Sequence, residues 1–254
     1  MNYIGSKRKL APLIYNYINE IVPSGIFCDL FAGTGAVSEK FASNYDLIVN
    51  DWELYGYYIN LQKFGSYVPD KYLNQKLEYL NSLTPEAGFI AANYSTYESE
   101  RMYFTEENAA IIDTMRFEIE EIAEGQSERR YLIALLLEAS DKVANVASVY
   151  GAYLKNFKDS AKKRLVIKDL PKYCSTATVY NEDANCLDVS GDVVYLDPPY
   201  NTRHYGANYH MLNTIVRYNY FEPKGKTGLP EYKKSPYCSK VKITAAFEDL
   251  IKNL

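Results

Sequence analysis

The chain has 254 residues, of which 47% are hydrophobic, and its formal net charge at pH 7 is −4. A chain of this size and apolar content can bury a full core, so we expect either one domain with an insertion or two small domains. No apolar run is long enough to span a membrane and the N-terminus lacks the apolar core of a signal peptide, which predicts a soluble, cytoplasmic protein without a membrane partner. The four cysteines are widely spaced and there are only two histidines, a pattern that argues against a metal site and indicates reduced thiols.

Charge is unevenly distributed along the chain. Residues 98–128 are strongly acidic, whereas lysines and arginines gather at 155–172 and at 224–242, the second cluster interleaved with tyrosines. Local basic patches can bind phosphate groups despite a negative total charge. Charge alone fits two solvated surfaces equally well, so nucleic-acid binding is one of two interpretations at this point.

The first elements along the chain predict a nucleotide-binding half-fold. Residues 9–20 carry apolar side chains at helical spacing. Residues 26–31 are typical of a buried strand, and a glycine turn and a short helix at 36–41 follow it. A second strand at 47–49 ends next to Asp51. This succession of strand, glycine turn, helix, strand and acid is typical of a Rossmann-like sheet.

The central part of the chain has a different pattern. Residues 55–172 are mainly helical by apolar spacing and include helix-like stretches at 106–124 and 130–149. Strand patterns return at 178–180 and 193–196. We therefore expect an α/β fold in which a mainly helical region is inserted into the sheet domain.

The four residues Asp197-Pro198-Pro199-Tyr200 directly follow the last predicted strand. The carboxylate can accept one N–H of an exocyclic amine, the carbonyl of Pro198 can accept the other, and the tyrosine ring can stack on the base that carries the amine. The two prolines have a fixed φ and no N–H to donate, so these acceptors stay directed outward. An ordinary strand followed by a proline-rich turn is the alternative interpretation.

The glycine turn at 33–35 narrows the choice of cofactor. Ser38 stands where a dinucleotide fingerprint has its third glycine and no Gly-Lys-Ser/Thr follows, so neither NAD nor ATP is favoured. Asp29 suits a ligand with an ammonium group and would repel a pyrophosphate. S-adenosylmethionine has that ammonium group. It also has ribose hydroxyls that can donate hydrogen bonds to Asp51 and an adenine amino group that can donate one to Asp183. Each acid also has an ordinary structural role open to it, in turns for Asp29 and Asp183 and as a helix N-cap for Asp51.

Four stretches together resemble the adenine-N6-specific DNA methyltransferases of the D12 class, which serve in restriction-modification systems. They are residues 2–7, 27–35, 181–184 and 197–200, of which the second and the fourth are the specific motifs. The resemblance covers residues 1 to about 240. It implies a Rossmann-like, S-adenosylmethionine-dependent enzyme that methylates a flipped adenine at a specific site in double-stranded DNA.

The resemblance also implies roles for particular residues. It assigns the cofactor site to Tyr3, Lys7, Asp29, Phe31, Gly33, Gly35, Asp51 and Asp183. It assigns the target base to Asp197, Pro198, Pro199 and Tyr200. From the chemistry of the base site we also expect Asn201 and the aromatic-rich stretch 205–209 to close over the base. Residues 1–54 and 173–254 would form the catalytic core, and 55–172 a DNA-recognition module. His204 and His210 are expected to be loop or packing residues, because a direct displacement needs no strong base.

The C-terminus departs from the family pattern. About three further strands are expected after the helix predicted at 244–254, and their absence would leave a strand edge unpaired and apolar surface exposed. We therefore expect a truncated or split enzyme that is completed by a second, C-terminal polypeptide or by a homodimer.

Three other functions stay open from the sequence. A truncated, inactive remnant could bind DNA or cofactor without catalysis. An RNA adenine methyltransferase would use the same tetrad, since the tetrad specifies the geometry of the amine and not the polymer. Cytosine-N4 methylation would also fit, although a serine in place of Asp197 is more typical there.

Overall fold

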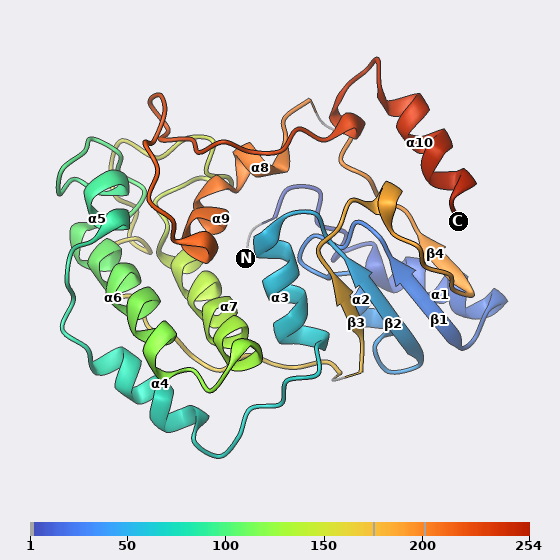
Figure 1. Ribbon diagram of the computed structural model, residues 1–254, viewed down its shortest axis with the longest axis horizontal. Helices are drawn as coiled ribbons and strands as arrows, with labels where there is room; N and C mark the ends of the chain where they lie inside the picture. Colours follow the sequence, from blue (N-terminus) through green and yellow to red (C-terminus); the bar gives the residue numbers. More distant parts are fainter. Residues whose placement is uncertain (1–2, 175, 201) are drawn as a thin grey trace. The chain divides into compact units, whose positions relative to one another are not determined.

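The computed structural model describes residues 3–174, 176–200 and 202–254 (Figure 1). Contacts within the chain divide it into two compact units. The helical unit comprises Met1–Ile4, Val68–Leu170 and Gly206–Tyr232. The sheet unit comprises Gly5–Tyr67, Pro171–Tyr205 and Lys233–Leu254. The separate assignment of residues 55–172 to DNA recognition stays a prediction.

The sheet unit is built on four parallel strands. In sheet order these are β3 (Thr178–Tyr180), β2 (Tyr45–Asn50), β1 (Gly25–Asp29) and β4 (Val193–Tyr195) (Figure 1). In the register Asp29 pairs with Val49 on one side and with Tyr195 on the other. Because neighbouring strands run parallel, the carboxyl ends of all four meet at one edge of the sheet. The predicted strands are confirmed, except that β1 ends at Asp29, because the chain turns at the next residue, and β4 ends at Tyr195, one residue before its predicted end.

Helices cover both faces of this sheet, because successive apolar side chains of its strands point to opposite faces and both faces must be buried. On one face, α1 (Ala11–Ile21), α2 (Ser38–Phe41) and the end of α3 (Leu54–Phe64) pack against β1 and β2. The ring of Phe27 in β1 stacks on that of Phe41 in α2, with centroids 3.8 Å apart. On the other face lie the short 3-10 helix η1 (Ala184–Cys186) and α10 (Ile243–Lys252). This confirms the α/β class and the Rossmann-like sheet that the sequence predicts.

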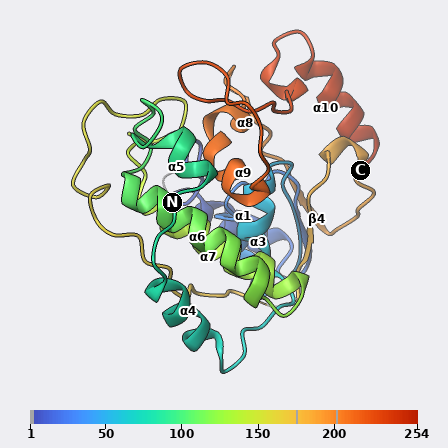
Figure 2. The ribbon, with the colours of Figure 1, turned by 60° about the vertical axis from the view of Figure 1, so that its left-hand side comes forward.

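The helical unit is organised around α6 (Glu106–Ile122), which contacts α4 (Leu73–Ser82), α5 (Phe89–Tyr94) and α7 (Gln126–Val143). Figure 2 shows α6 and α7 side by side. The Thr105 hydroxyl caps α6 by accepting a hydrogen bond from the backbone N–H of Asn108. Two further helices follow later in the chain. The first, α8 (Tyr205–Asn208), begins at the last residue of the sheet-unit segment Pro171–Tyr205. The second, α9 (His210–Arg217), contacts α7.

The expected helix at 130–149 is wrong at its C-terminal end, because α7 stops at Val143. The reason lies in Asn145, which is fully buried. Its backbone N–H donates to the carbonyl of Tyr103 at 2.7 Å, and its side-chain amide donates to the carbonyls of Met102 and Leu154. These bonds replace those of a helix, and no helix occurs at 144–174. In the described part of the chain, no helix is both long and apolar enough to cross a membrane.

Candidate active site

The four predicted acids lie at or just beyond the ends of the four strands. Asp29 is the last residue of β1, and Asp51 directly follows β2. Asp183 lies three residues after the end of β3, and Asp197 two residues after the end of β4. In sheets of this kind, ligands bind outside the carboxyl ends of the strands. Acids that are far apart in the sequence therefore belong to one edge of the sheet.

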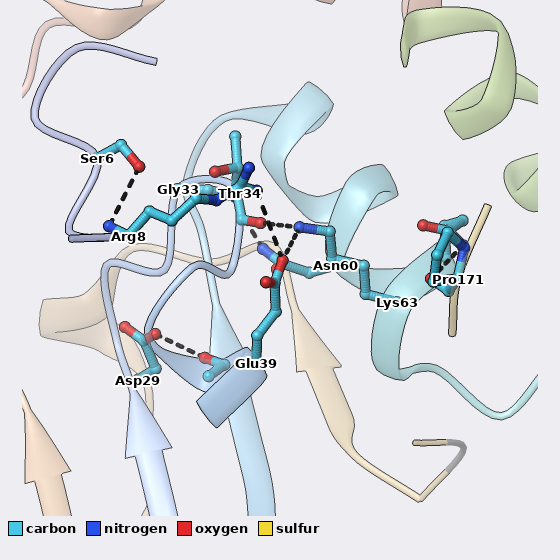
Figure 3. Close-up of polar contacts among 11 residues, drawn as sticks. Ser6, Arg8, Asp29, Gly33, Thr34, Glu39, Asn60, Lys63 and Pro171 are labelled. Carbon is cyan, nitrogen blue, oxygen red and sulfur yellow. Dashed lines mark hydrogen bonds and ion pairs between the residues drawn. The ribbon is translucent and has the colours of Figure 1, made fainter. Parts of the chain in front are cut away.

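Asp29 carries a buried acceptor without a donor. The residue is 1% exposed, and its Oδ2 accepts a hydrogen bond of 2.6 Å from the Ser38 hydroxyl, drawn in Figure 3. Its Oδ1 has no partner within the described part of the chain. Burial, and less strongly the nearby charge of Asp197, raises the pKa of Asp29 to about 7. A buried oxygen of this kind suits a ligand that brings a positive charge or a hydrogen-bond donor.

The glycine turn next to Asp29 requires its glycines. Gly33 and Gly35 have φ values of +56° and +73°, in the left-handed region. A Cβ at Gly35 would lie 2.3 Å from Oδ1 of Asn60 and 2.7 Å from Cε2 of Phe64. The turn is thus packed against α3 too closely for any side chain at Gly35.

Polar side chains of α3 hold this turn in place (Figure 3). Asn60 donates to the carbonyl of Gly33 at 3.1 Å, and the ammonium group of Lys63 donates to the carbonyl of Thr34 at 2.7 Å. Lys63 also forms an ion pair of 2.5 Å with Glu39 of α2. These supports were not predicted from the sequence. The signal that points to them is the presence of polar residues on the buried side of a helix, where Asn60 and Lys63 are 0% and 8% exposed.

Asp51 combines its predicted position with a structural role. It is 8% exposed, and its two oxygens accept hydrogen bonds from the backbone N–H groups of Gly33 at 2.7 Å and Glu53 at 2.8 Å. A Cβ at Gly56 would lie 2.7 Å from Oδ1 of Asp51, so this glycine makes room for the carboxyl group. Burial is the main cause that raises the pKa of Asp51 to about 8. Each oxygen keeps a lone pair that could accept a ligand hydroxyl.

Three other predicted cofactor residues have partners of their own. Asp183 accepts a hydrogen bond of 3.1 Å from the N–H of Asn185 and so caps η1. The half-buried ring of Phe31 meets that of Tyr237 edge-on, with centroids 5.2 Å apart. Tyr3 belongs to the helical unit, where its ring stacks on that of Tyr209 at 4.8 Å. Their roles in cofactor binding stay predictions.

The catalytic tetrad is engaged by Lys7. The Lys7 ammonium group lies 2.5 Å from Oδ2 of Asp197, 3.2 Å from the carbonyl oxygen of Gly5, and 5.5 Å from the centre of the Tyr200 ring. The side chains of Lys7 and Asp197 are 20% and 23% exposed. Tyr200 is 63% exposed, so its side chain is accessible to a planar partner. The structure thus places Lys7, which the sequence assigned to the cofactor, with the groups predicted to hold the base.

The remaining predicted residues lie in loops or in packing positions. His204 accepts a hydrogen bond of 3.2 Å at Nδ1 from the N–H of Ser235. His210 is buried, its Nε2 lies 3.0 Å from the carbonyl oxygen of Tyr150, and burial lowers its pKa to about 4. Asn2 and Asn201 lie outside the described residues. Among the residues that are described, no cluster of three His, Cys, Asp or Glu side chains could hold a metal ion.

Comparison with known proteins identifies the family. A family model described as D12 class N6 adenine-specific DNA methyltransferase matches residues 3–254. The whole chain is 45% identical to the Type II methyltransferase M.NlaIII of Neisseria lactamica and covers 80% of that protein. It is 41% identical to the Type II methyltransferase M.CviAII of Paramecium bursaria Chlorella virus 1, again covering 80%. It is 39% identical to the Type II methyltransferase M.FokI of Planomicrobium okeanokoites, where 99% of the chain covers 42% of the relative.

No solved structure matches the chain significantly. The matches give no support to the expected complementing polypeptide or homodimer. The chain belongs to the family of D12 class N6 adenine-specific DNA methyltransferases.

Proposed function

We propose that this protein is the site-specific adenine-N6 methyltransferase of a type II restriction-modification system, and that it moves a methyl group from S-adenosylmethionine to an adenine flipped out of duplex DNA. The family match and the relatives named Type II methyltransferases support the reaction class. The observation that carries the proposal is the unpartnered Oδ1 of Asp29, buried beside the glycine turn and close enough to Asp197 for their charges to interact.

The residues at the sheet edge fit S-adenosylmethionine. Its ammonium group can donate to Oδ1 of Asp29, which otherwise remains a buried acceptor without a donor. Its ribose hydroxyls can donate to Asp51, and its adenine amino group to Asp183. When bound, the cofactor supplies a methyl group on a positively charged sulfur. The buried carboxyl of Asp29 then gains the opposite charge that stabilises its ionised form.

The tetrad would position the nitrogen that accepts the methyl group. Asp197 and the carbonyl of Pro198 accept the two N–H bonds of the adenine amine, which favours a pyramidal nitrogen with its lone pair directed at the methyl carbon. Positive charge would develop on this nitrogen as it takes the methyl group from the sulfonium, which would leave as a neutral thioether, and the carboxylate of Asp197 would stabilise that charge. The excess amine proton would then pass through this carboxylate to water. The Lys7 ammonium group donates to Oδ2 of Asp197, so the amine would donate to Oδ1 of the same carboxylate.

A base within a duplex cannot reach this tetrad and has to leave the helix stack. Flipping a base costs a few kcal/mol. The exposed ring of Tyr200 offers a surface on which the flipped base can stack and recover part of that cost. Contacts from basic side chains to DNA phosphates would supply the rest.

The test is the transfer of labelled methyl from S-adenosylmethionine to unmethylated bacterial DNA by the purified chain, followed by nucleoside analysis. N6-methyladenine supports the proposal, whereas N4-methylcytosine, or labelling of RNA alone, contradicts it. Asp29→Asn and Asp197→Ala separate the two subsites. The first should weaken cofactor binding, and the second should abolish transfer while cofactor binding persists. If the wild-type chain binds cofactor and DNA but transfers no methyl group, it is a binding remnant.

A further inference from the structure

The helical unit contains a pocket that methyl transfer at the sheet edge does not use. Its volume is about 450 Å³, within the usual size of sites for small ligands. Its lining includes Thr214 and Arg217 of α9, Asn219 and Phe221 of the following segment, and Lys224 and Glu231 beyond them. All of these residues belong to the Gly206–Tyr232 segment of the helical unit.

Buried polar contacts fix the wall formed by the end of α9. Arg116, which is 2% exposed, donates to the carbonyls of Ile215 at 3.0 Å and Val216 at 3.1 Å. Tyr218 has φ +44° and ψ +42°, and is the only described non-glycine residue with positive φ. Its hydroxyl donates to Asp113 at 2.6 Å. Strained backbone held in this way commonly marks a functional position, and here it sets the directions of the two residues on either side of Tyr218.

The opposite wall is also held in place. Lys224 and Leu229 exchange backbone hydrogen bonds of 3.1 and 2.9 Å, which closes a tight turn. Arg101 donates to the carbonyl of Gly225 at 3.1 Å, and the hydroxyl of Tyr94 donates to that of Gly228 at 2.7 Å. A Cβ at Gly228 would lie 2.8 Å from Cε1 of Tyr94, so this close packing needs glycine. Both walls therefore present their side chains from a fixed backbone.

The polar groups of the pocket are mixed in character, and two of them have no partner among the described residues. Within the described part of the chain, the guanidinium group of Arg217 and the amide of Asn219 are exposed and have no hydrogen-bond or ion-pair partner. Arg101 and Arg116, in contrast, are both bound to carbonyl groups. The lining holds two cations and also two carboxylates, Glu222 and Glu231, of which Glu231 lies 3.6 Å from the ammonium group of Lys224.

This mixture of charges suits the edges of bases better than phosphates. Two carboxylates would repel a phosphate, whereas they can accept hydrogen bonds from base amino groups. Arginine matches the two acceptors of guanine, and asparagine matches the acceptor and donor of adenine. Phe221 adds an aromatic face for base contact. The occupant that fits this chemistry is a nucleobase of the DNA substrate.

We propose that this pocket is a sequence-reading site of the enzyme, in which Arg217 and Asn219 bind base edges of the recognition sequence. The proposal rests on duplex DNA being the substrate. The ordinary alternative is that Arg217, in the last turn of α9, only stabilises the helix dipole. That role would change stability and leave the recognised sequence unaltered.

The test is selection of bound duplexes from a randomised DNA library, followed by sequencing and by methylation of the selected duplexes. The variants are Arg217→Lys, Asn219→Ala and, as a matched control that removes an exposed cation elsewhere in the helical unit, Lys71→Ala. Arg217→Lys keeps the charge and the dipole interaction but loses the two-pronged geometry of the guanidinium group. Melting temperature and cofactor binding should be unchanged in all three, because these side chains are exposed.

We expect Arg217→Lys and Asn219→Ala each to lower discrimination at one position of the recognised sequence, by about tenfold or more, while the control retains the wild-type sequence. An unchanged sequence in both pocket variants, or equal weakening on every duplex, would overturn the proposal. So would a wild-type chain that selects no sequence at all. The wild type could also bind DNA sequence-selectively without methylating it, while the two pocket variants bind less selectively. That result would support the assignment of the pocket as a sequence-reading site and contradict the proposed catalytic function.

Discussion

Raising the pH from 6 to 8 should strengthen binding of S-adenosylmethionine, because Asp29 must be ionised to pair with the cofactor's ammonium group. With a pKa of about 7, Asp29 is ionised in about one molecule in ten at pH 6 and about nine in ten at pH 8. The fraction competent to form the ion pair therefore rises about tenfold. In Asp29→Asn this part of the pH dependence disappears, because the amide does not titrate.

Isothermal titration calorimetry at several pH values, in buffers with different ionisation enthalpies, measures both the affinity and the protons released on binding. The cofactor's own amine loses its proton in alkaline solution, so the informative quantity is the difference between wild type and Asp29→Asn. We expect the ratio of the wild-type affinity to the Asp29→Asn affinity to grow about tenfold from pH 6 to pH 8. We also expect the wild type to release up to one proton more than the variant on binding, because Asp29 loses its proton. Parallel pH profiles for the two proteins would show that Asp29 does not ionise on binding, and the assignment of the ammonium group to it would fail.

The same ionisation of Asp29 lowers the stability of the folded, cofactor-free protein as the pH rises, whereas it strengthens cofactor binding. The pKa of Asp29 is higher in the folded cofactor-free protein than in the unfolded chain, where about 3.9 is expected, so the folded state holds this proton more tightly. Its contribution is fully present below about pH 4 and is lost as the pH rises to about 7. The loss is at most about 4 kcal/mol, from about three pKa units. Melting of wild type and Asp29→Asn across this window measures it as the difference between their pH profiles.

Three further substitutions test the site and its supports. Asp197→Ala should lower single-turnover methyl transfer by at least about 10²-fold with cofactor affinity unchanged, because the charge on the amine loses its stabilising carboxylate; undiminished transfer would remove Asp197 from its role. Gly35→Val should destabilise the protein by more than about 1 kcal/mol in denaturant unfolding, since its side chain would overlap two residues of α3, whereas Gly151→Ala meets nothing closer than 3.7 Å and should have little effect. Arg116→Met should cost about 3 kcal/mol, because it leaves carbonyls at the end of α9 unpaired in a buried position. The exposed Arg164→Met should cost less than about 1 kcal/mol, and equal losses for the two arginines would contradict this account.

Local chemistry explains which parts of the fold the sequence predicts. The strands and the glycine turn follow from apolar runs and turn residues within a few positions of one another, and α1, α6 and α10 follow from helical spacing. The stretch 144–174 also carries apolar residues, yet the side chain of Asn145 binds the carbonyl of Met102 before it in the sequence and that of Leu154 after it, and no helix forms. The spacing of apolar residues along the chain indicates which side chains are buried. In this stretch, hydrogen bonds to distant residues decide whether the buried backbone is helical.

The supports of the site could not be predicted, because each joins residues far apart in the chain. Asn60 and Lys63 bind the glycine turn across about 30 positions, and Tyr218 binds Asp113 across 105. A polar residue on a buried helix shows that some partner exists, but the sequence does not say which one. The pocket of the helical unit has the same origin, since buried contacts of this range hold its walls.

Lys7 shows how much such a contact changes the interpretation of a motif. Its place in the N-terminal motif assigned it to the cofactor, whereas its ammonium group lies against Asp197, 190 positions away. A carboxylate at the end of a strand would otherwise face the site without a donor. If adenine binds there, its amine can donate to Oδ1 of Asp197 while the Lys7 ammonium group stays on Oδ2, because a carboxylate accepts several hydrogen bonds. The ammonium group already neutralises part of the charge of Asp197 and so weakens its hydrogen bond to the amine, and stacking on Tyr200 and contacts to the DNA backbone must supply most of the binding energy of the base.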